Sequence, residues 1–174
     1  PRPAAQTHRG AVHYFKLSRE LSDALRLLSK TEGTTLFVVV LAAFKALLSR
    51  YTGQTDILVG SPVANRSYIE TEPLIGLFVN TLVFRTDTSG NPSFRELLKR
   101  VREVVLRGHE YQELPFERLV TELQTERSLS HAPLFQVEFF LDNKGQRATE
   151  VAGLQLQPIK TESGTAKFDI TLAM

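Results

Sequence analysis

The segment IGLFVNTLVFR, residues 75–85, constrains the fold of this chain more than any other stretch. Its nearly unbroken apolar run predicts a β-strand with both faces buried. With a period of two, Asn80 shares one face with Phe78 and Leu82, while Arg85 lies on the other. A buried amide or guanidinium needs hydrogen-bond partners, so neighbouring segments must supply them. Asn80 is therefore either a satisfied structural amide or an amide that faces a substrate channel.

The composition indicates one globular domain without a nucleic-acid partner. A chain of 174 residues and 19.5 kDa is long enough to bury about 70% of the surface that its unfolded form exposes. Its 42% hydrophobic and 23% charged residues are ordinary for a globular protein. The 21 basic and 19 acidic residues nearly cancel, and the net charge of +2 leaves no basic footprint for nucleic acid.

No segment predicts export or membrane insertion. The longest apolar run, residues 36–44, is far shorter than the roughly 20 residues that span a bilayer. The first residues, PRPAAQTHRG, lack the apolar core of a signal peptide, and we interpret residues 1–13 as a linker. The absence of cysteine excludes disulfides and thiolate chemistry and permits a cytosolic compartment. We therefore expect a cytoplasmic protein with no membrane partner.

Capping residues and apolar stripes predict four helices. Ser18 is a suitable N-cap for the first, and the capping box from Ser93 to Glu96 starts the third. The second is apolar on all sides in its first turns, which indicates packing on several sides. Pro115, at a first helical position, starts a short fourth helix. The predicted ranges are 18–32, 35–52, 93–108 and 115–123.

Strands are expected between and after these helices. A short strand over residues 57–59 leads into a loop, because Pro62 and Asn65 disfavour regular structure. Alternating apolar residues predict three later strands, within residues 135–141, 154–156 and 168–172. With helices grouped early and strands grouped late, the pattern predicts an α/β (α+β) fold. We expect a two-layer sandwich with a mixed β-sheet covered on one face.

The residues alone offer no catalytic constellation. None of the four histidines pairs at the spacing of metal ligands, so we expect no bound metal. They are His8, His13, His109 and His131. The sequence also has no G-x-S-x-G elbow, P-loop or dinucleotide fingerprint. The sequence therefore lacks the motifs through which serine hydrolases, NTPases and Rossmann oxidoreductases act.

Four blocks in a fixed order carry a specific family resemblance. They are DILVGSPVANR (56–66), IGLFVNTLVFR (75–85), YQELPFERLV (111–120) and RSLSHAPLFQV (127–137). In this order and at these separations the chain resembles the C-terminal half of the condensation domain of nonribosomal peptide synthetases. Residues 35–60 and AKFDITL (166–172) are similar to the same family. The resemblance implies a chloramphenicol acetyltransferase-like fold, with residues 14–174 as a C-terminal subdomain that is truncated at its C-terminal end.

The resemblance also implies a reaction and partners. The family forms an amide bond between aminoacyl or peptidyl thioesters bound to carrier proteins, and this half would supply one wall of the substrate tunnel. Its expected partners are the N-terminal half of the domain, the donor and acceptor peptidyl carrier domains and the adenylation domain. The 4'-phosphopantetheine arms belong to the carriers, so this chain binds no cofactor directly. The family's base is a histidine of an H-H-x-x-x-D-G motif that this chain lacks. We therefore expect no catalytic residue here, and an inactive isolated chain.

Five polar positions match the family's blocks. We expect Ser61 to bind substrate through the acceptor amine, although a loop serine bonded to its own backbone fits equally well. We expect Asn80 to face the channel. Arg66 and Arg85 are expected to be structural, each paired with a carboxylate or carbonyls. Arg127 matches the family's last block and is also expected to be structural.

Three positions depart from the family's blocks. Tyr111 stands where a histidine usually begins the block, and Glu113 replaces its aspartate. Ser128 replaces the aspartate that usually follows Arg127. Three alternatives therefore stay open. One is a divergent relative for epimerisation, heterocyclisation or recruitment of partners, and another is a plain interaction module. The third, an acyltransferase that uses free coenzyme A, is weakened because no strong basic cluster is present.

Overall fold

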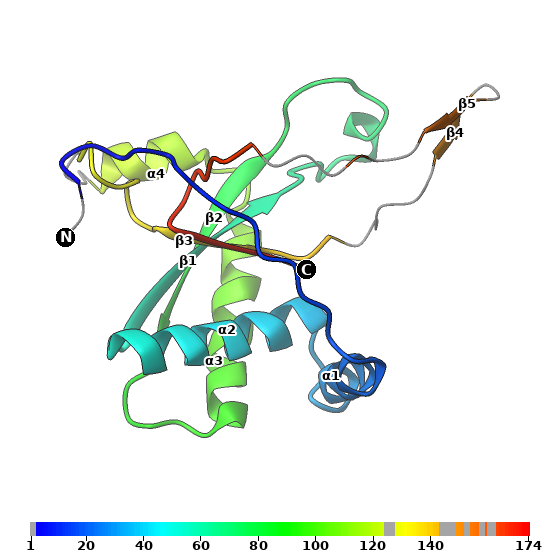
Figure 1. Ribbon diagram of the computed structural model, residues 1–174. Helices are drawn as coiled ribbons and strands as arrows, with labels where there is room; N and C mark the ends of the chain where they lie inside the picture. Colours follow the sequence, from blue (N-terminus) through cyan, green and yellow to red (C-terminus); the bar gives the residue numbers. More distant parts are fainter. Residues whose placement is uncertain (1–2, 124–127, 143–148, 152–153, 157–158, 160–162) are drawn as a thin grey trace.

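The computed structural model describes residues 3–123, 128–142, 149–151, 154–156, 159 and 163–174. Figure 1 shows a mixed β-sheet with two long helices crossing it. The helices are α1 (Arg19–Thr31), α2 (Leu36–Thr52), α3 (Phe94–Glu110), α4 (Phe116–Glu122) and the short 3-10 helix η1 (Ile69–Thr71). The strands are β1 (Asp56–Val63), β2 (Asn80–Asp87), β3 (Val137–Phe140), β4 (Thr149–Val151), β5 (Leu154–Leu156) and β6 (Ile170–Ala173).

The predicted helix caps are present. The Ser18 hydroxyl accepts a hydrogen bond from the Leu21 amide at 3.2 Å, which fixes the start of α1. Ser93 and Glu96 form the reciprocal capping box at the start of α3. Gly53 ends α2 with a φ of 70°, a left-handed conformation that glycine adopts without steric cost. The four helices lie within two residues of their predicted bounds.

The main sheet has the order β2-β1-β3-β6. Strands β1 and β2 are antiparallel, whereas β3 runs parallel to β1 and β6 runs parallel to β3. Helix α3 packs against β2 and α2, α2 also contacts β1, and α1 packs on α2. These layers confirm the expected two-layer fold with a mixed sheet. Strands β4 and β5 form a separate two-stranded sheet.

The expectation of a doubly buried strand over residues 75–85 is wrong. Strand β2 begins at Asn80, because its pairing with β1 ends at the register Val63↔Asn80. Residues before Asn80 have no strand partner, and Ile75 is fully exposed. Within β2 only Leu82, Phe84 and Thr86 are buried. The strand is therefore half-buried, with one solvent face, as antiparallel strands often are.

Strand β1 is longer than predicted. It continues through Pro62, which pairs with Thr81 of β2. The missing N–H of Pro62 is tolerated because the other edge of β1 pairs with β3 only at Gly60. Asn65, with a φ of 51°, lies in the loop that follows. Because proline disfavours a strand, the sequence predicted only residues 57–59 of β1.

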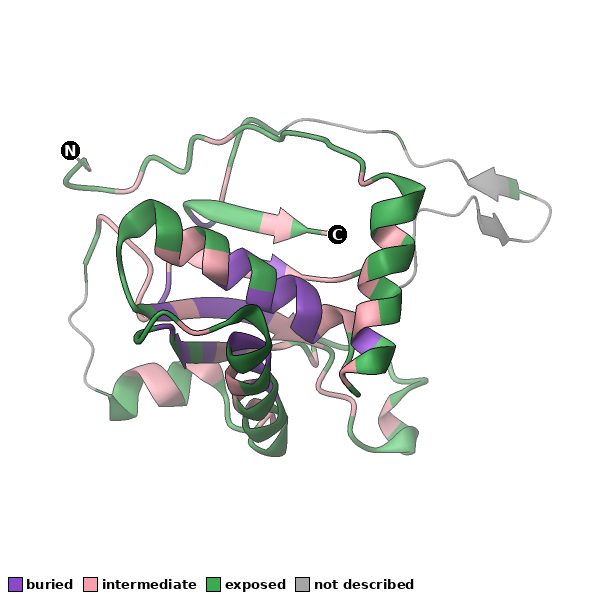
Figure 2. Ribbon diagram, turned by 90° about the horizontal axis from the view of Figure 1, so that it is seen from below, coloured by how far each residue is buried: buried purple, intermediate pink, exposed green. Residues whose placement is uncertain are grey.

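The core lies between α2, α3 and the sheet. It includes Val39, Leu41, Phe84, Val101 and Phe139, all fully buried. Figure 2 shows the buried residues concentrated on α2 and the strands behind it, whereas α1 is mostly exposed. Among the described residues no single helix is long and apolar enough to cross a membrane. Helices α1 and α2 together have the length and apolar composition of a membrane span, but they form a pair that is bent by 108°.

The segment before α1 lies along the C-terminal part of the chain. The Gly10 amide donates to the Gly164 carbonyl at 2.9 Å, and the Ala166 amide donates to the His8 carbonyl at 2.8 Å. A side chain at position 10 would collide with Ala166, because an added Cβ would lie 2.5 Å from its Cβ. Residues 6–10 are thus paired through their backbone, and the assignment of residues 1–13 as a linker stays a prediction.

Candidate functional site

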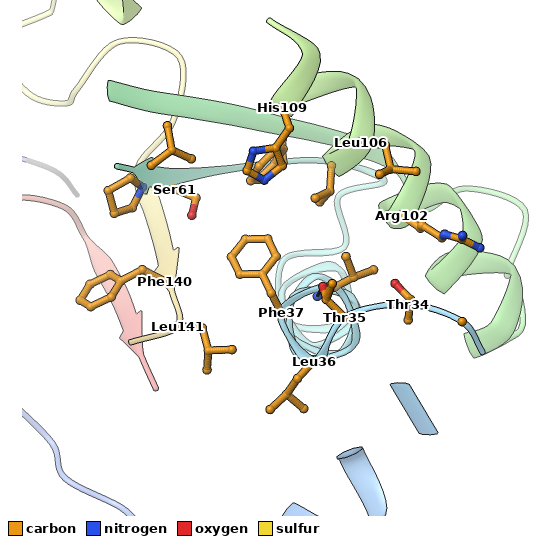
Figure 3. Close-up of a pocket in the computed structure, with 16 residues that line it drawn as sticks. Thr34, Thr35, Leu36, Phe37, Ser61, Arg102, Leu106, His109, Phe140 and Leu141 are labelled. Atoms are coloured by element: carbon orange, nitrogen blue, oxygen red, sulfur yellow. Dashed lines mark hydrogen bonds between the residues drawn. The ribbon is translucent and has the colours of Figure 1, made fainter. Parts of the chain in front are cut away.

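A cavity of about 760 Å³ lies between the start of α2, the second half of α3 and strands β1 and β3. Figure 3 shows side chains from these elements converging on it. Most of its walls are apolar. The main apolar residues are Leu36, Phe37, Val63, Val105, Leu106 and Phe140. The polar residues in its walls include Thr34, Ser61, Arg102 and His109.

Of the predicted site residues that the structure describes, only Ser61 lines this cavity. It lies in β1 opposite Leu82 of β2, and it is only 2% exposed. Figure 3 shows its side chain on the wall formed by β1. In the described part of the chain its hydroxyl has no hydrogen-bond partner. Among the described residues, Asn65 Oδ1 is the one fully buried side-chain oxygen or nitrogen without a partner, so the Ser61 hydroxyl is open to the cavity and can bind a polar group there.

His109 is a cavity residue that the sequence analysis did not select. Its ring centroid lies 6.3 Å from that of Phe84, and Figure 3 shows the imidazole directed at the cavity. Helix α3 approaches Phe84 closely at Gly108, where an added Cβ would lie 2.7 Å from the Phe84 ring. Helical spacing could have revealed the residue, since Arg102, Val105 and His109 lie on one face of α3.

Asn80 lies outside this cavity and is fully hydrogen-bonded within the chain. Its Nδ2 donates to the carbonyls of Gln112 and Leu114, each at 2.7 Å. Its Oδ1 accepts from the amides of Phe116 at 3.1 Å and Thr81 at 2.9 Å. The side chain thereby joins the start of β2 to the segment between α3 and α4. Direct contact of Asn80 with a substrate stays a prediction.

Arg66 organises the loop that precedes β2. Its guanidinium donates to the carbonyls of Thr71, Glu72 and Leu74, the last at 3.0 Å. The same group lies 4.1 Å from the centroid of the Phe78 ring. These contacts support the structural role proposed for Arg66.

Arg85 pairs with Asp56 across the two antiparallel strands. Its Nε donates to Asp56 Oδ1 at 2.9 Å, and its Nη2 donates to Oδ2 at 2.8 Å. This hydrogen bonding lowers the pKa of the Asp56 carboxyl and raises the pKa of Arg85. Both side chains are at least half exposed, so the pair is not the buried one expected, and it adds little to stability. Arg127 lies outside the described residues.

Lys45 is a buried cation that the sequence analysis also missed. It follows the apolar run of α2 and is fully buried. Its Nζ donates to the Phe84 carbonyl at 2.5 Å, the Thr86 hydroxyl at 2.9 Å and the Ile57 carbonyl at 3.2 Å. Burial lowers the pKa of Lys45 to about 7, and the Asp56 carboxylate partly opposes this shift. Among the described residues no group of three His, Asp or Glu is placed to hold a metal ion.

Comparison with known proteins gives concordant matches. A family model described as "Condensation domain" matches residues 1–174. One of the linear gramicidin synthase proteins of Brevibacillus parabrevis is 57% identical, with 100% of this chain and 3% of the relative covered. Chondramide synthase cmdD of Chondromyces crocatus is 46% identical, with 99% and 4% covered. The chain thus spans only a small part of these relatives.

Two solved structures show the same fold. Holo-AB3403, a four-domain nonribosomal peptide synthetase, matches with a TM-score of 0.91 and 28% identity, over 100% of this chain and 14% of that one. The X-domain from teicoplanin biosynthesis matches with a TM-score of 0.88 and 29% identity, over 99% and 39%. The expected chloramphenicol acetyltransferase-like fold is thereby confirmed.

Proposed function

Because the chain belongs to the condensation-domain family of nonribosomal peptide synthetases, we propose that it supplies one wall of the tunnel in which two carrier-bound substrates are joined. The reaction is the attack of an acceptor aminoacyl amine on a donor thioester. The C–N bond forms while the C–S bond breaks, and the donor's carrier leaves as a thiol. The partners in this proposal are the N-terminal half of the domain, the two peptidyl carrier domains and an adenylation domain, in the cytoplasm.

One observation carries the proposal. Ser61 is only 2% exposed, its hydroxyl is open to the cavity, and this hydroxyl has no hydrogen-bond partner in the described part of the chain. A hydroxyl can hydrogen-bond an amine and hold its nitrogen in a fixed direction. Orienting the amine contributes to rate because attack requires alignment with the thioester carbon. Ser61 thus positions the acceptor amine, and the base comes from the other half of the domain.

Asn80 has a supporting place in the same proposal. By holding the carbonyls of Gln112 and Leu114, it fixes the segment between α3 and α4. That segment follows His109, whose side chain lines the cavity. Asn80 therefore stabilises the end of α3 from outside the cavity. The 4'-phosphopantetheine arms of the carriers bring both substrates, and this chain holds no cofactor of its own.

The test of this proposal is Ser61→Ala in the intact domain. We expect kcat/KM for dipeptide formation to fall about tenfold, which corresponds to ~1.4 kcal/mol of transition-state stabilisation. The melting temperature should stay unchanged, because the hydroxyl makes no hydrogen bond within the described part of the chain. Product is measured as dipeptidyl thioester by intact-protein mass spectrometry.

Ser29→Ala is the matched control. Ser29 is also buried, but its hydroxyl donates to the Arg26 carbonyl at 2.8 Å within α1, away from the cavity. This variant should lose a little stability and keep its activity. Wild-type activity in Ser61→Ala would show that Ser61 does not position the amine.

A second candidate function is a divergent or inactive domain that recruits a partner. The observation that favours it is the match to the X-domain from teicoplanin biosynthesis, which has been solved in a complex with OxyB. Epimerisation or heterocyclisation are further variants of this candidate. Dipeptide formation by the intact domain separates the candidates, since a recruitment domain would bind its partner and form no dipeptide.

A further inference from the structure

The cavity is much larger than the binding of one amine requires. Its volume of about 760 Å³ falls within the roughly 300–1,000 Å³ typical of small-molecule sites. Ser61 occupies only the wall formed by β1. The remaining walls come from the start of α2, from α3 and from the end of β3. Space is therefore left for a substantial group attached to the carbon that bears the amine.

The wall formed by α2 is rigid. The Phe37 ring contacts two core rings, with centroid distances of 5.0 Å to Phe139 and 6.0 Å to Phe84. Both partners are fully buried. Phe37 thus presents a fixed aromatic surface to the cavity, on which an apolar ligand group gains contact without reordering the protein.

The wall formed by α3 contains an apolar side chain that the protein itself does not cover. Leu106 lines the cavity and is 56% exposed. An apolar group placed between Leu106 and Phe37 would remove apolar surface of both residues from water. The cavity therefore favours an apolar occupant over a polar one.

Charge restricts the occupant further. Arg102, one turn before Leu106 on α3, also lines the cavity. It has no ion-pair or hydrogen-bond partner in the described part of the chain, so its charge is not neutralised by a nearby carboxylate. The guanidinium is exposed and adds only a screened repulsion, whereas the apolar walls around Phe37 and Leu106 disfavour a cationic side chain because they would remove it from water without a partner. The combination selects large, uncharged apolar groups.

We propose that this cavity is the side-chain subsite for the acceptor amino acid, and that it selects large apolar side chains, aromatic or aliphatic, over small and cationic ones. The inference rests on the proposed function, since Ser61 holds the acceptor amine. The acceptor side chain extends from Ser61 between Phe37 and Leu106, and Leu106 sets the width of the subsite.

The test compares acceptor carriers loaded with phenylalanine, alanine or lysine, with the intact domain and one fixed donor. We expect the wild type to use phenylalanine at least tenfold faster than alanine or lysine. Leu106→Trp should narrow the subsite, lowering the rate with phenylalanine at least tenfold and changing the rate with alanine less than threefold. Leu106→Phe should have the same effect in weaker form, and it is the variant to use if tryptophan impairs folding.

Leu47→Trp is the matched control. Leu47 lies on α2, is 52% exposed and does not line the cavity, so this variant should keep the wild-type preference. Equal rates with all three acceptors, or an equal effect of Leu106→Trp on phenylalanine and alanine, would overturn the subsite and leave the proposed function intact. Absence of product with every acceptor in the wild type would overturn the proposed function, and the subsite with it.

Discussion

At the scale of single residues, Asn80 shows how one side chain joins two distant segments. Its amide has two donors and two acceptor positions, and all four are used within the chain. Three of the four bonds go to Gln112, Leu114 and Phe116, more than 30 positions away. No other side chain offers both donors and acceptors in this planar arrangement except glutamine, which is longer.

Asn80→Ala should therefore lower stability and activity together. The substitution leaves two carbonyls and one amide of the segment between α3 and α4 without partners, at a cost of about 1–3 kcal/mol in the free energy of unfolding. Urea denaturation measures the stability, and dipeptide formation by the intact domain measures the activity. Loss of activity at wild-type stability would instead support direct contact of Asn80 with the substrate.

The need of Asn80 for partners was predictable, and the identity of those partners was not. An amide within an apolar segment must be satisfied, which the sequence shows by itself. The partners are backbone groups, and every residue carries the same ones, so no sequence pattern marks them. For His109, helical spacing predicts the face of α3 that it shares with Arg102 and Val105, but the cavity beside that face also needs residues of α2 and β1, which are distant in the sequence.

At the scale of elements, Lys45 joins helix α2 to strands β1 and β2. Its ammonium has three donors, and they meet the carbonyls of Ile57 and Phe84 and the hydroxyl of Thr86. The charge is nevertheless costly, because it lies in the core without a contacting carboxylate. Asp56 is near enough to raise the pKa but does not cancel the effect of burial.

The stability of the chain should therefore depend on pH through Lys45. The folded-state pKa of about 7 lies below the ordinary value of 10.5, so between these values the unfolded chain binds more protons than the folded one. Stability should rise with pH across this window, by up to about 1.4 kcal/mol per unit. Asp56 and Asp87 have lowered pKa values and Arg85 a raised one, so none of them titrates there.

Urea denaturation at pH 7, 8 and 9 measures this dependence, with Lys45→Met as the comparison. The variant cannot titrate at this position, so its stability should lack the rise attributed to Lys45. Identical slopes for both proteins would show that Lys45 stays charged in the folded chain across the window.

The elements differ in how well the sequence predicted them. Helix ends were predictable because caps such as Ser18 and Ser93 act through bonds to residues only three positions away. Strand ends were not, because the start of β2 depends on where β1 stops providing partners, at Val63. The apolar residues 75–79 were assigned to a strand for this reason, although they precede it.

At the scale of the whole molecule, the loop before β2 exposes several apolar side chains close together in the sequence. Ile75 and Leu77 are almost fully exposed, and Leu74 and Val79 are more than half exposed. Arg66 holds this loop through its backbone carbonyls, so the apolar side chains project from an ordered frame. Exposed apolar side chains that gather on one ordered loop favour its contact with a partner.

The edges of the sheet add to this surface. Strand β6 is an edge strand of the main sheet, and its Ile170 is about half exposed. Unpaired edge strands offer backbone donors and acceptors to other chains. The chain also corresponds to 39% of the teicoplanin X-domain chain, so the same fold elsewhere contains considerably more polypeptide. Both features agree with the proposal above, in which these surfaces contact a partner.

The 174-residue chain expressed alone should therefore form no dipeptide and should self-associate. It lacks the H-H-x-x-x-D-G motif that carries the family's base, and it exposes the loop of Ile75 and Leu77 and the edge of β6. Incubation with both loaded carriers, followed by intact-protein mass spectrometry, tests the activity against the intact domain. Sedimentation velocity over a range of concentrations tests the association, and a double variant, Ile75→Ser with Leu77→Ser, should shift the chain toward monomer. Dipeptide formation by the isolated chain at the rate of the intact domain would contradict the proposal that the base comes from the other half of the domain, because the wall that holds Ser61 would then suffice for the chemistry.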